Sequence, residues 1–189
     1  YVRQVFACGV DPEIEREIGL PVVEAVARRA RFAVGGTILT ARMALRSGIA
    51  CNTAGGGHHA RRDRGAGFCV FNDVAVAIRA LQAEGLIANA LVIDLDVHQG
   101  DGTAAIFAGD PTVTTFSMHS EKNYPVRKVP SNLDIALADE TGDEAYLRAL
   151  ANALPHLLDG AAPDIVFYNA GVDPHRDDRL GRLALSDRG

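Results

Sequence analysis

Four short apolar segments, each followed closely by polar residues, constrain the fold of this chain more than any other feature. They cover residues 49–53, 90–93, 112–117 and 165–169. These segments lack the alternation of apolar and polar residues that marks a half-exposed sheet, so they predict strands buried on both faces. Such strands are typical of parallel sheets, in which helices connect one strand to the next.

Three helical patterns precede or separate the predicted strands, over residues 34–46, 73–84 and 143–158. The second pattern has Asn72 or Asp73 as its candidate N-cap, and Gly85 follows its end. The third contains Pro155, which is expected to kink or split the helix. The alternation predicts an α/β fold with a mostly parallel sheet, and 189 residues suffice for one domain.

The strongest polar cluster follows the second apolar segment, where ligands of α/β proteins bind. It reads Asp94-Leu95-Asp96-Val97-His98-Gln99-Gly100-Asp101-Gly102. Because side chains alternate along a strand, Asp94, Asp96 and His98 project to one face. Two carboxylates and an imidazole are costly to bury together without a cation. A strand end paired with arginines is the structural alternative, but this stretch contains no lysine or arginine.

Two further clusters follow predicted strands. Asp173 comes shortly after the last one, and with Asp96 and His98 it makes a three-ligand set of the kind found in catalytic zinc sites. Zinc is the first choice of metal, and Fe(II) or Co(II) could use the same ligands. His58 and His59 follow a glycine run that allows the backbone to approach a substrate closely.

Together, four ordered motifs resemble the histone deacetylase family. They are Gly55-Gly56-Gly57-His58-His59-Ala60, Gly67-Phe68-Cys69-Val70-Phe71-Asn72-Asp73, residues 94–102, and Asn169-Ala170-Gly171-Val172-Asp173. Residues 116–119, 123–125 and 178–181 resemble the bacterial and class IV branch most. The resemblance runs from about residue 1 to 189. It implies the arginase–deacetylase fold, with three layers α/β/α, over a single catalytic domain spanning 1–189.

The resemblance implies zinc-dependent removal of an acyl group, acetyl or longer, from a lysine side chain. Asp96, His98 and Asp173 would hold the zinc. His59 would act as the general base that takes a proton from the attacking water and then donates one to the leaving amine. His58 would help to position the water and stabilise charge.

The remaining motif residues would support this chemistry. Asp101 would orient His59 and Asp94 would orient His58, each through the ring nitrogen that faces away from the site. Gly67 and Phe68 would contact the substrate, with Phe68 as the aromatic wall of a narrow channel for the acyl-lysine. A potassium ion is implied at a second site, formed by Asp94, Asp96, His98, Ser117 and Met118.

One expected element is missing from the chain. The family's oxyanion-stabilising tyrosine lies in a glycine-rich loop well beyond the second metal-binding aspartate. Tyr124, Tyr146 and Tyr168 do not lie in such a context. We therefore expect the sequence to be a fragment, truncated at both ends, of a larger active enzyme.

Composition excludes several other classes. The net charge of −5 argues against a nucleic-acid partner, and no apolar run approaches the roughly 20 residues that span a bilayer. Cys8, Cys51 and Cys69 form no C-x-x-C pair, which argues against a disulfide scaffold or a thiolate zinc site. We expect a cytoplasmic protein whose partner is an acylated lysine of a protein or an acylated small amine.

Three alternatives stay open. An amidohydrolase of the same fold that acts on acetylated polyamines would carry the same motifs. A ureohydrolase with two manganese ions would have a different aspartate-rich pattern, and this chain fits the single-zinc branch better. An inactive acyl-binding or scaffold protein would follow if the chain were complete without the tyrosine loop.

Overall fold

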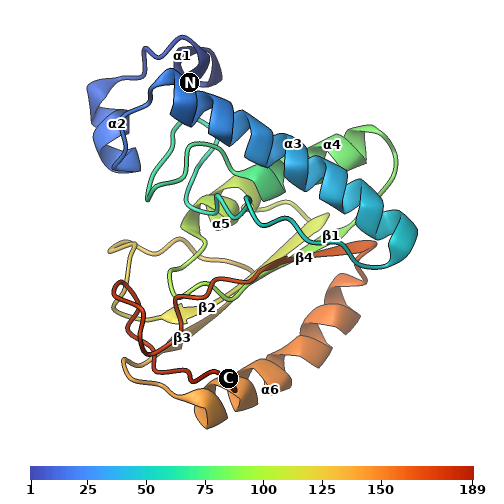
Figure 1. The fold of residues 1–189 in the computed structure, drawn as a ribbon. Helices are drawn as coiled ribbons and strands as arrows, with labels where there is room; N and C mark the ends of the chain where they lie inside the picture. The colour runs from blue at the N-terminus through green and yellow to red at the C-terminus, as the bar shows by residue number, and fades with distance from the viewer. The chain divides into compact units, whose positions relative to one another are not determined.

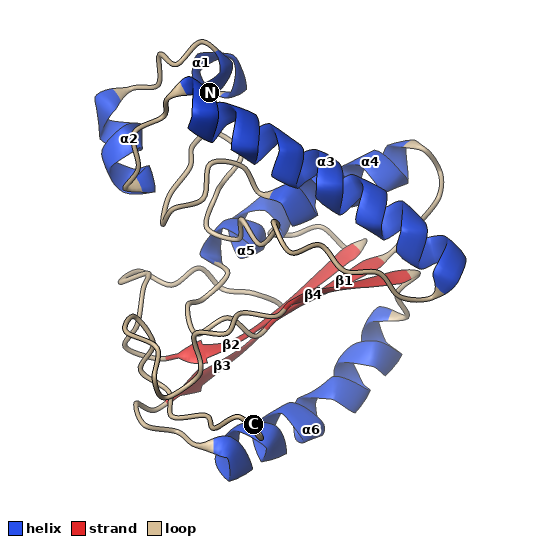
Figure 2. Cartoon of the chain, in the orientation of Figure 1, coloured by secondary structure: helices blue, strands red, loops and turns tan.

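The computed structural model describes all 189 residues, and they divide into two compact units. The first unit is Tyr1–Ile87 and the second is Ala88–Gly189. The first is helical and the second contains the sheet (Figure 2).

The first unit contains four helices: α1 (Val2–Phe6), α2 (Pro12–Ile18), α3 (Glu24–Ser47) and α4 (Asp73–Ala83). The long helix α3 contacts both α1 and α4 (Figure 1). Of the two N-cap candidates for α4, Asn72 has this role, because its side chain accepts a 2.9 Å hydrogen bond from the N–H of Ala75. At the end of α2, Gly19 adopts a left-handed conformation with φ of 76° and closes the helix.

The second unit is built on one parallel sheet, and this confirms the predicted α/β class. Its elements are β1 (Ala90–Asp94), α5 (Asp101–Phe107), β2 (Val113–Ser120), β3 (Leu133–Leu137), α6 (Asp143–Ala161) and β4 (Ile165–Asn169). The strand order is β3-β2-β1-β4, and every pair is parallel. Asp94 is level with Ser117 on one side and with Asn169 on the other. The loops that follow these strands therefore begin at the same end of the sheet, where the strands have their carboxyl ends (Figure 2).

The main core of the second unit lies between α6 and the sheet (Figure 1). All five residues of β1 are buried, as expected for a central parallel strand. Helix α6 contributes Tyr146, Ala153 and Leu157 to this core. It also continues through Pro155, so the helix is not split there. Pro155 and Ala151 are both exposed, so the carbonyl that loses its helical donor can bond to water.

Other differences from the predicted elements have local causes. Residues 49–53 form no strand, because Ile49 is 79% exposed and no neighbouring strand pairs with the segment. Strand β3 was not predicted, since its residues are only partly buried or exposed at one edge of the sheet. At the opposite edge, β4 alternates buried and exposed residues instead of being buried on both faces.

No helix of the chain is both long enough and apolar enough to cross a membrane.

Candidate metal centre

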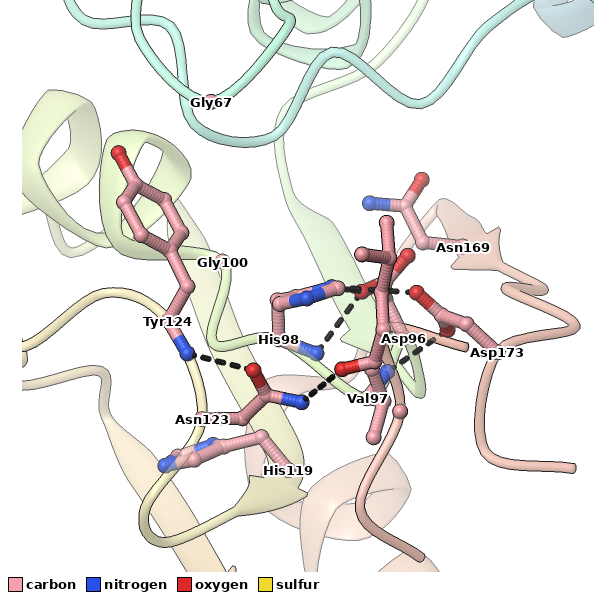
Figure 3. A network of polar contacts seen from close by, with 12 residues as sticks. Gly67, Asp96, Val97, His98, Gly100, His119, Asn123, Tyr124, Asn169 and Asp173 are labelled. Atoms are coloured by element: carbon pink, nitrogen blue, oxygen red, sulfur yellow. Dashed lines mark hydrogen bonds and ion pairs between the residues drawn. The ribbon is translucent and has the colours of Figure 1, made fainter. Parts of the chain in front are cut away.

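Three candidate ligands meet beyond the carboxyl ends of two neighbouring strands. Asp96 and His98 follow β1, and Asp173 follows β4. Their ligand atoms all lie within 4.8 Å of one another, and all three side chains are partly buried (Figure 3). The parallel pairing of β1 with β4 therefore brings together residues that lie 75 or more positions apart in the sequence.

Hydrogen bonds orient these three side chains. His98 Nδ1 lies 2.9 Å from Asp96 Oδ1 and 3.1 Å from Asp173 Oδ2. The main-chain N–H of His98 donates to Asp96 Oδ1 at 2.8 Å, and the N–H of Val97 donates to Asp173 Oδ1 at 3.0 Å (Figure 3). One nitrogen and two carboxylates thus converge on a common point.

The electrostatics of the cluster favour a cation. Burial alone would lower the pKa of His98, but hydrogen bonds to Asp173 and Asp96, together with their charges, outweigh burial and raise this pKa to about 9. The two carboxylates therefore stabilise positive charge between them, as they would stabilise a bound divalent ion.

The backbone nearby leaves room for these ligands. A Cβ on Gly171 would lie 2.8 Å from Asp96 Oδ2 and 2.9 Å from Asp173 Oδ1, closer than side-chain carbons approach such atoms. The loop after β4 can therefore pass beside the ligands only with glycine at this position. Two Asp oxygens and one His nitrogen fit a zinc site that keeps a coordination position open.

The residues predicted to bind potassium lie on β1 and β2 and just beyond β1. Asp94 and Ser117 are both buried and level with each other in the sheet. The Asp94 carboxylate accepts hydrogen bonds from Asn169 Nδ2 and from the N–H of Asp96, both at 3.2 Å. Met118 has no exposed surface and belongs to the apolar core, so only its main-chain oxygen could bind an ion. A potassium site here stays a prediction.

In the first unit, His58 and His59 are buried neighbours whose ring centroids lie 4.0 Å apart. The buried carboxylate of Asp73 fixes the glycine loop before them, because it accepts the N–H of Gly57 at 2.7 Å and the N–H of Gly56 at 3.0 Å. A Cβ on Gly57 would lie 2.1 Å from the carbonyl oxygen of Phe71, so only glycine fits at that position. Side-chain and backbone contacts within this unit thus constrain the histidine pair.

Gly67 and Phe68 form a tight turn in the same unit. Both have positive φ values, 53° and 65°, and Ala66 and Cys69 exchange two main-chain hydrogen bonds across the turn. The N–H groups of Gly67 and Phe68 donate to the carbonyls of Glu17 and Ile18 at the end of α2. Phe68 is 62% exposed. An exposed phenylalanine in a left-handed conformation is strained, and such strain is concentrated at functional sites.

Asp101 is the first residue of α5 and is almost completely buried. The structure thus places Asp94, Asp101 and the three metal-ligand candidates in the second unit. His58, His59, Gly67 and Phe68 belong to the first. The roles predicted for His58, His59, Asp94 and Asp101 stay predictions.

Sequence reasoning missed Tyr124, which lies in the loop between β2 and β3. Its ring centroid is 6.4 Å from that of His98, in an edge-on arrangement. In Figure 3 the ring stands near His98, with its hydroxyl turned away from the three ligand side chains. The sequence marked residues 123–125 only as a segment that resembles a branch of the family, because the path of the loop, and not the segment itself, brings the ring beside His98.

Comparison with known proteins now adds to this geometry. A model of the histone deacetylase domain matches residues 2–189. This chain belongs to the histone deacetylase family. That membership confirms the resemblance stated from the motifs.

Several family members are similar over most of the chain. An uncharacterized Picosynechococcus protein is 55% identical over all of this chain and 63% of its own length. A probable deacetylase of Methanothermobacter thermautotrophicus is 36% identical over 84% of this chain and 52% of its own length. Histone deacetylase 2 of Arabidopsis thaliana is 37% identical over 84% of this chain and 42% of its own length. The chain thus spans less than two thirds of these relatives.

The crystal structure of the HDA15 HD domain confirms the fold. It matches with a TM-score of 0.73 and 28% identity, covering 86% of this chain and 51% of that one. The predicted arginase–deacetylase α/β fold is therefore correct.

Proposed function

We propose that this chain is part of a zinc-dependent deacylase that removes an acetyl or longer acyl group from lysine side chains. The observation that carries the proposal is the convergence of Asp96, His98 and Asp173 beyond the carboxyl ends of β1 and β4. Membership in the histone deacetylase family and relatives with deacetylase names support it.

Asp96, His98 and Asp173 would hold the metal. When bound, zinc polarises an amide carbonyl and lowers the pKa of water toward neutrality. The carboxylates would balance its charge, and Val97 and Gly171 would keep Asp173 in place through a hydrogen bond and close packing.

The histidine pair would move the protons. His59 would accept a proton from water at a ring nitrogen and donate one to the amine as it leaves, since an ordinary imidazole titrates near neutrality. His58 would stabilise charge beside it. In this proposal Asp101 orients His59, Asp94 orients His58, and each acts through the outer ring nitrogen.

The substrate side of the proposal concerns Gly67 and Phe68. The turn they form presents an exposed aromatic ring, which suits contact with the aliphatic part of an acyl-lysine. A potassium ion would be held by Asp94, Asp96, His98, Ser117 and Met118 and would supply a second, structural positive charge.

The experiment uses the longer enzyme that contains this chain, purified with zinc and assayed on an acetyl-lysine peptide and an acetylated polyamine. His59→Ala is expected to lower kcat at least about 100-fold while zinc content stays unchanged. His156→Ala, which changes an exposed histidine on α6, is the control. Unchanged kcat in His59→Ala would refute the assigned mechanism, and turnover of the polyamine alone would redirect the substrate assignment.

A further inference from the structure

The loop between β2 and β3 includes residues 123–129 and places Tyr124 near the metal-ligand candidate His98. Val126 at the tip is 97% exposed, whereas the neighbouring Pro125 is buried, so apolar packing holds only part of the loop. The loop also forms hydrogen bonds with the buried side chain and main chain of Gln99 and with the side chain of Lys128. These contacts restrain the backbone that carries the Tyr124 ring.

Gln99, the residue that follows His98, forms hydrogen bonds with both ends of this loop. Its main-chain N–H donates to the carbonyl of Tyr124 at 3.3 Å. Its side chain accepts the N–H of Val129 at 2.9 Å and donates to the carbonyl of Val129 at 2.8 Å. Gln99 is 1% exposed, so these bonds are shielded from water.

Lys128 ties the middle of the loop together. Its Nζ donates to the carbonyl of Asn123 at 2.6 Å and to the carbonyl of Pro125 at 2.7 Å, which are the residues on either side of Tyr124. Partial burial lowers the pKa of Lys128, and the nearby carboxylates of Asp101 and Glu121 act in the opposite direction. One ammonium group thus links the backbone before Tyr124 to the backbone after it.

We propose that Lys128 is a positioning residue that fixes Tyr124 beside His98, so that the ring forms one wall of the acyl-binding site. The inference rests on the proposed function for the identity of the bound group. The part that concerns Lys128 and Tyr124 rests only on contacts within the second unit. Hydrogen bonds from a charged donor are stronger than those from a neutral one. Because Lys128 donates two such bonds to the loop, its loss should make the loop more mobile than the loss of a surface lysine would.

The first test measures the loop without using activity. The chain has no tryptophan, so Tyr124→Trp introduces a single fluorescent reporter at the proposed wall. In that background, Lys128→Met is expected to lower the anisotropy of the tryptophan. In the otherwise unchanged chain, Lys128→Met should speed hydrogen exchange of the Tyr124 and Val129 amides at least about ten-fold. Lys122→Met, at an exposed lysine of the same segment, should change neither quantity.

The second test uses the longer zinc-loaded enzyme and an acyl-lysine peptide. Lys128→Met is expected to raise KM about ten-fold and to leave kcat within about three-fold, because the ligands and the histidine pair are untouched. Lys128→Arg, whose guanidinium can also donate to two carbonyls, should restore most of the loss. A merely structural role would lower kcat and the thermal midpoint together.

The two tests separate failure of this inference from failure of the proposed function. Unchanged exchange and anisotropy in Lys128→Met would overturn the positioning role, whatever the enzyme hydrolyses. Faster exchange throughout β2 and β3 would also overturn it, because the lysine would then support the whole sheet. If Lys128→Met makes the loop mobile but leaves KM unchanged in an active enzyme, Tyr124 does not form a wall of the acyl-binding site. If the parent enzyme is inactive but Lys128→Met makes the loop mobile, the deacylase proposal and the role of Tyr124 in acyl binding are both refuted. The positioning of Tyr124 by Lys128 is then still supported.

Discussion

The main-chain N–H of Val97 donates a 3.0 Å hydrogen bond to Asp173 Oδ1 and joins the segments that follow β1 and β4. The other oxygen of Asp173 lies 3.1 Å from His98 Nδ1. One oxygen therefore fixes the carboxylate to the backbone while the other faces the shared point of the cluster. Such preorganisation reduces the entropy that metal binding would otherwise cost.

Gly171→Ala should damage the metal centre through packing alone. The added Cβ would lie within 3 Å of Asp96 and Asp173 atoms, so at least one carboxylate must move. We expect the Kd for zinc, measured by isothermal titration, to rise at least about ten-fold. Gly160→Ala is the matched control on α6, where a Cβ meets no atom within 4 Å. Equal zinc affinity in both variants would contradict the role of Gly171.

Asp73→Asn should weaken the loop that precedes the histidine pair. The buried carboxylate accepts N–H groups of Gly56 and Gly57, and Thr37 Oγ1 lies 2.5 Å from its Oδ2. Loss of the charge should lower the free energy of unfolding by about 1–3 kcal/mol, as measured by urea denaturation. In the longer enzyme, kcat for an acyl-lysine peptide should fall, whereas the zinc content should stay the same. An equally large effect of Asp63→Asn, at an exposed aspartate, would refute this explanation.

Phe68→Asn tests whether the strained turn serves function. Asparagine tolerates the left-handed conformation better than phenylalanine, and the Phe68 ring is mostly exposed. The free energy of unfolding should therefore stay the same or rise by up to about 1 kcal/mol. KM for an acyl-lysine peptide should rise about ten-fold in the longer enzyme. A less stable variant with unchanged KM would mean that Phe68 supports only the fold.

Asp164 gives a prediction about pH. Hydrogen bonds from the N–H groups of Asn89 and Ala88 hold the pKa of this exposed carboxyl below its ordinary value. A depressed folded pKa adds stability above the unfolded pKa of about 3.9, and this stability is lost as the pH falls through the lower folded value. The stability difference between the parent and Asp164→Asn should thus be constant above about pH 5 and shrink below about pH 4.

Urea denaturation at a series of pH values measures this difference. Asp159→Asn, at an exposed position of α6, should show no such pH dependence. A difference for Asp164→Asn that grows as the pH falls would reverse the sign and contradict the assignment.

The sequence predicted the parts of the fold that carry strong local patterns. Strands β1, β2 and β4 are apolar runs, and α4 has an N-cap and an amphipathic face, so these elements were found close to their expected positions. Helix α5 was missed because its residues, starting at Asp101, were read as part of a polar motif. Strand β3 was missed because its pairing with β2 defines it more than its own composition does.

The candidate site likewise contains residues that the sequence predicted and residues that it did not. The identities of Asp96, His98 and Asp173 follow from motifs, and strand pairing then brings the three together. Gly171 and Tyr124 were not expected as parts of the site. Their roles depend on how closely one loop passes another, and no single segment of sequence encodes that distance.

Zinc binding by this chain tests the metal centre most directly. Metal analysis after equilibration with zinc should give one ion per chain. Asp96→Asn, His98→Ala and Asp173→Asn should each lower occupancy at least about ten-fold, and Asp177→Asn, at an exposed neighbouring aspartate, should not. Full zinc occupancy in the double variant Asp96→Asn/Asp173→Asn, or two transition-metal ions per parent chain, would contradict a single metal held by these three residues.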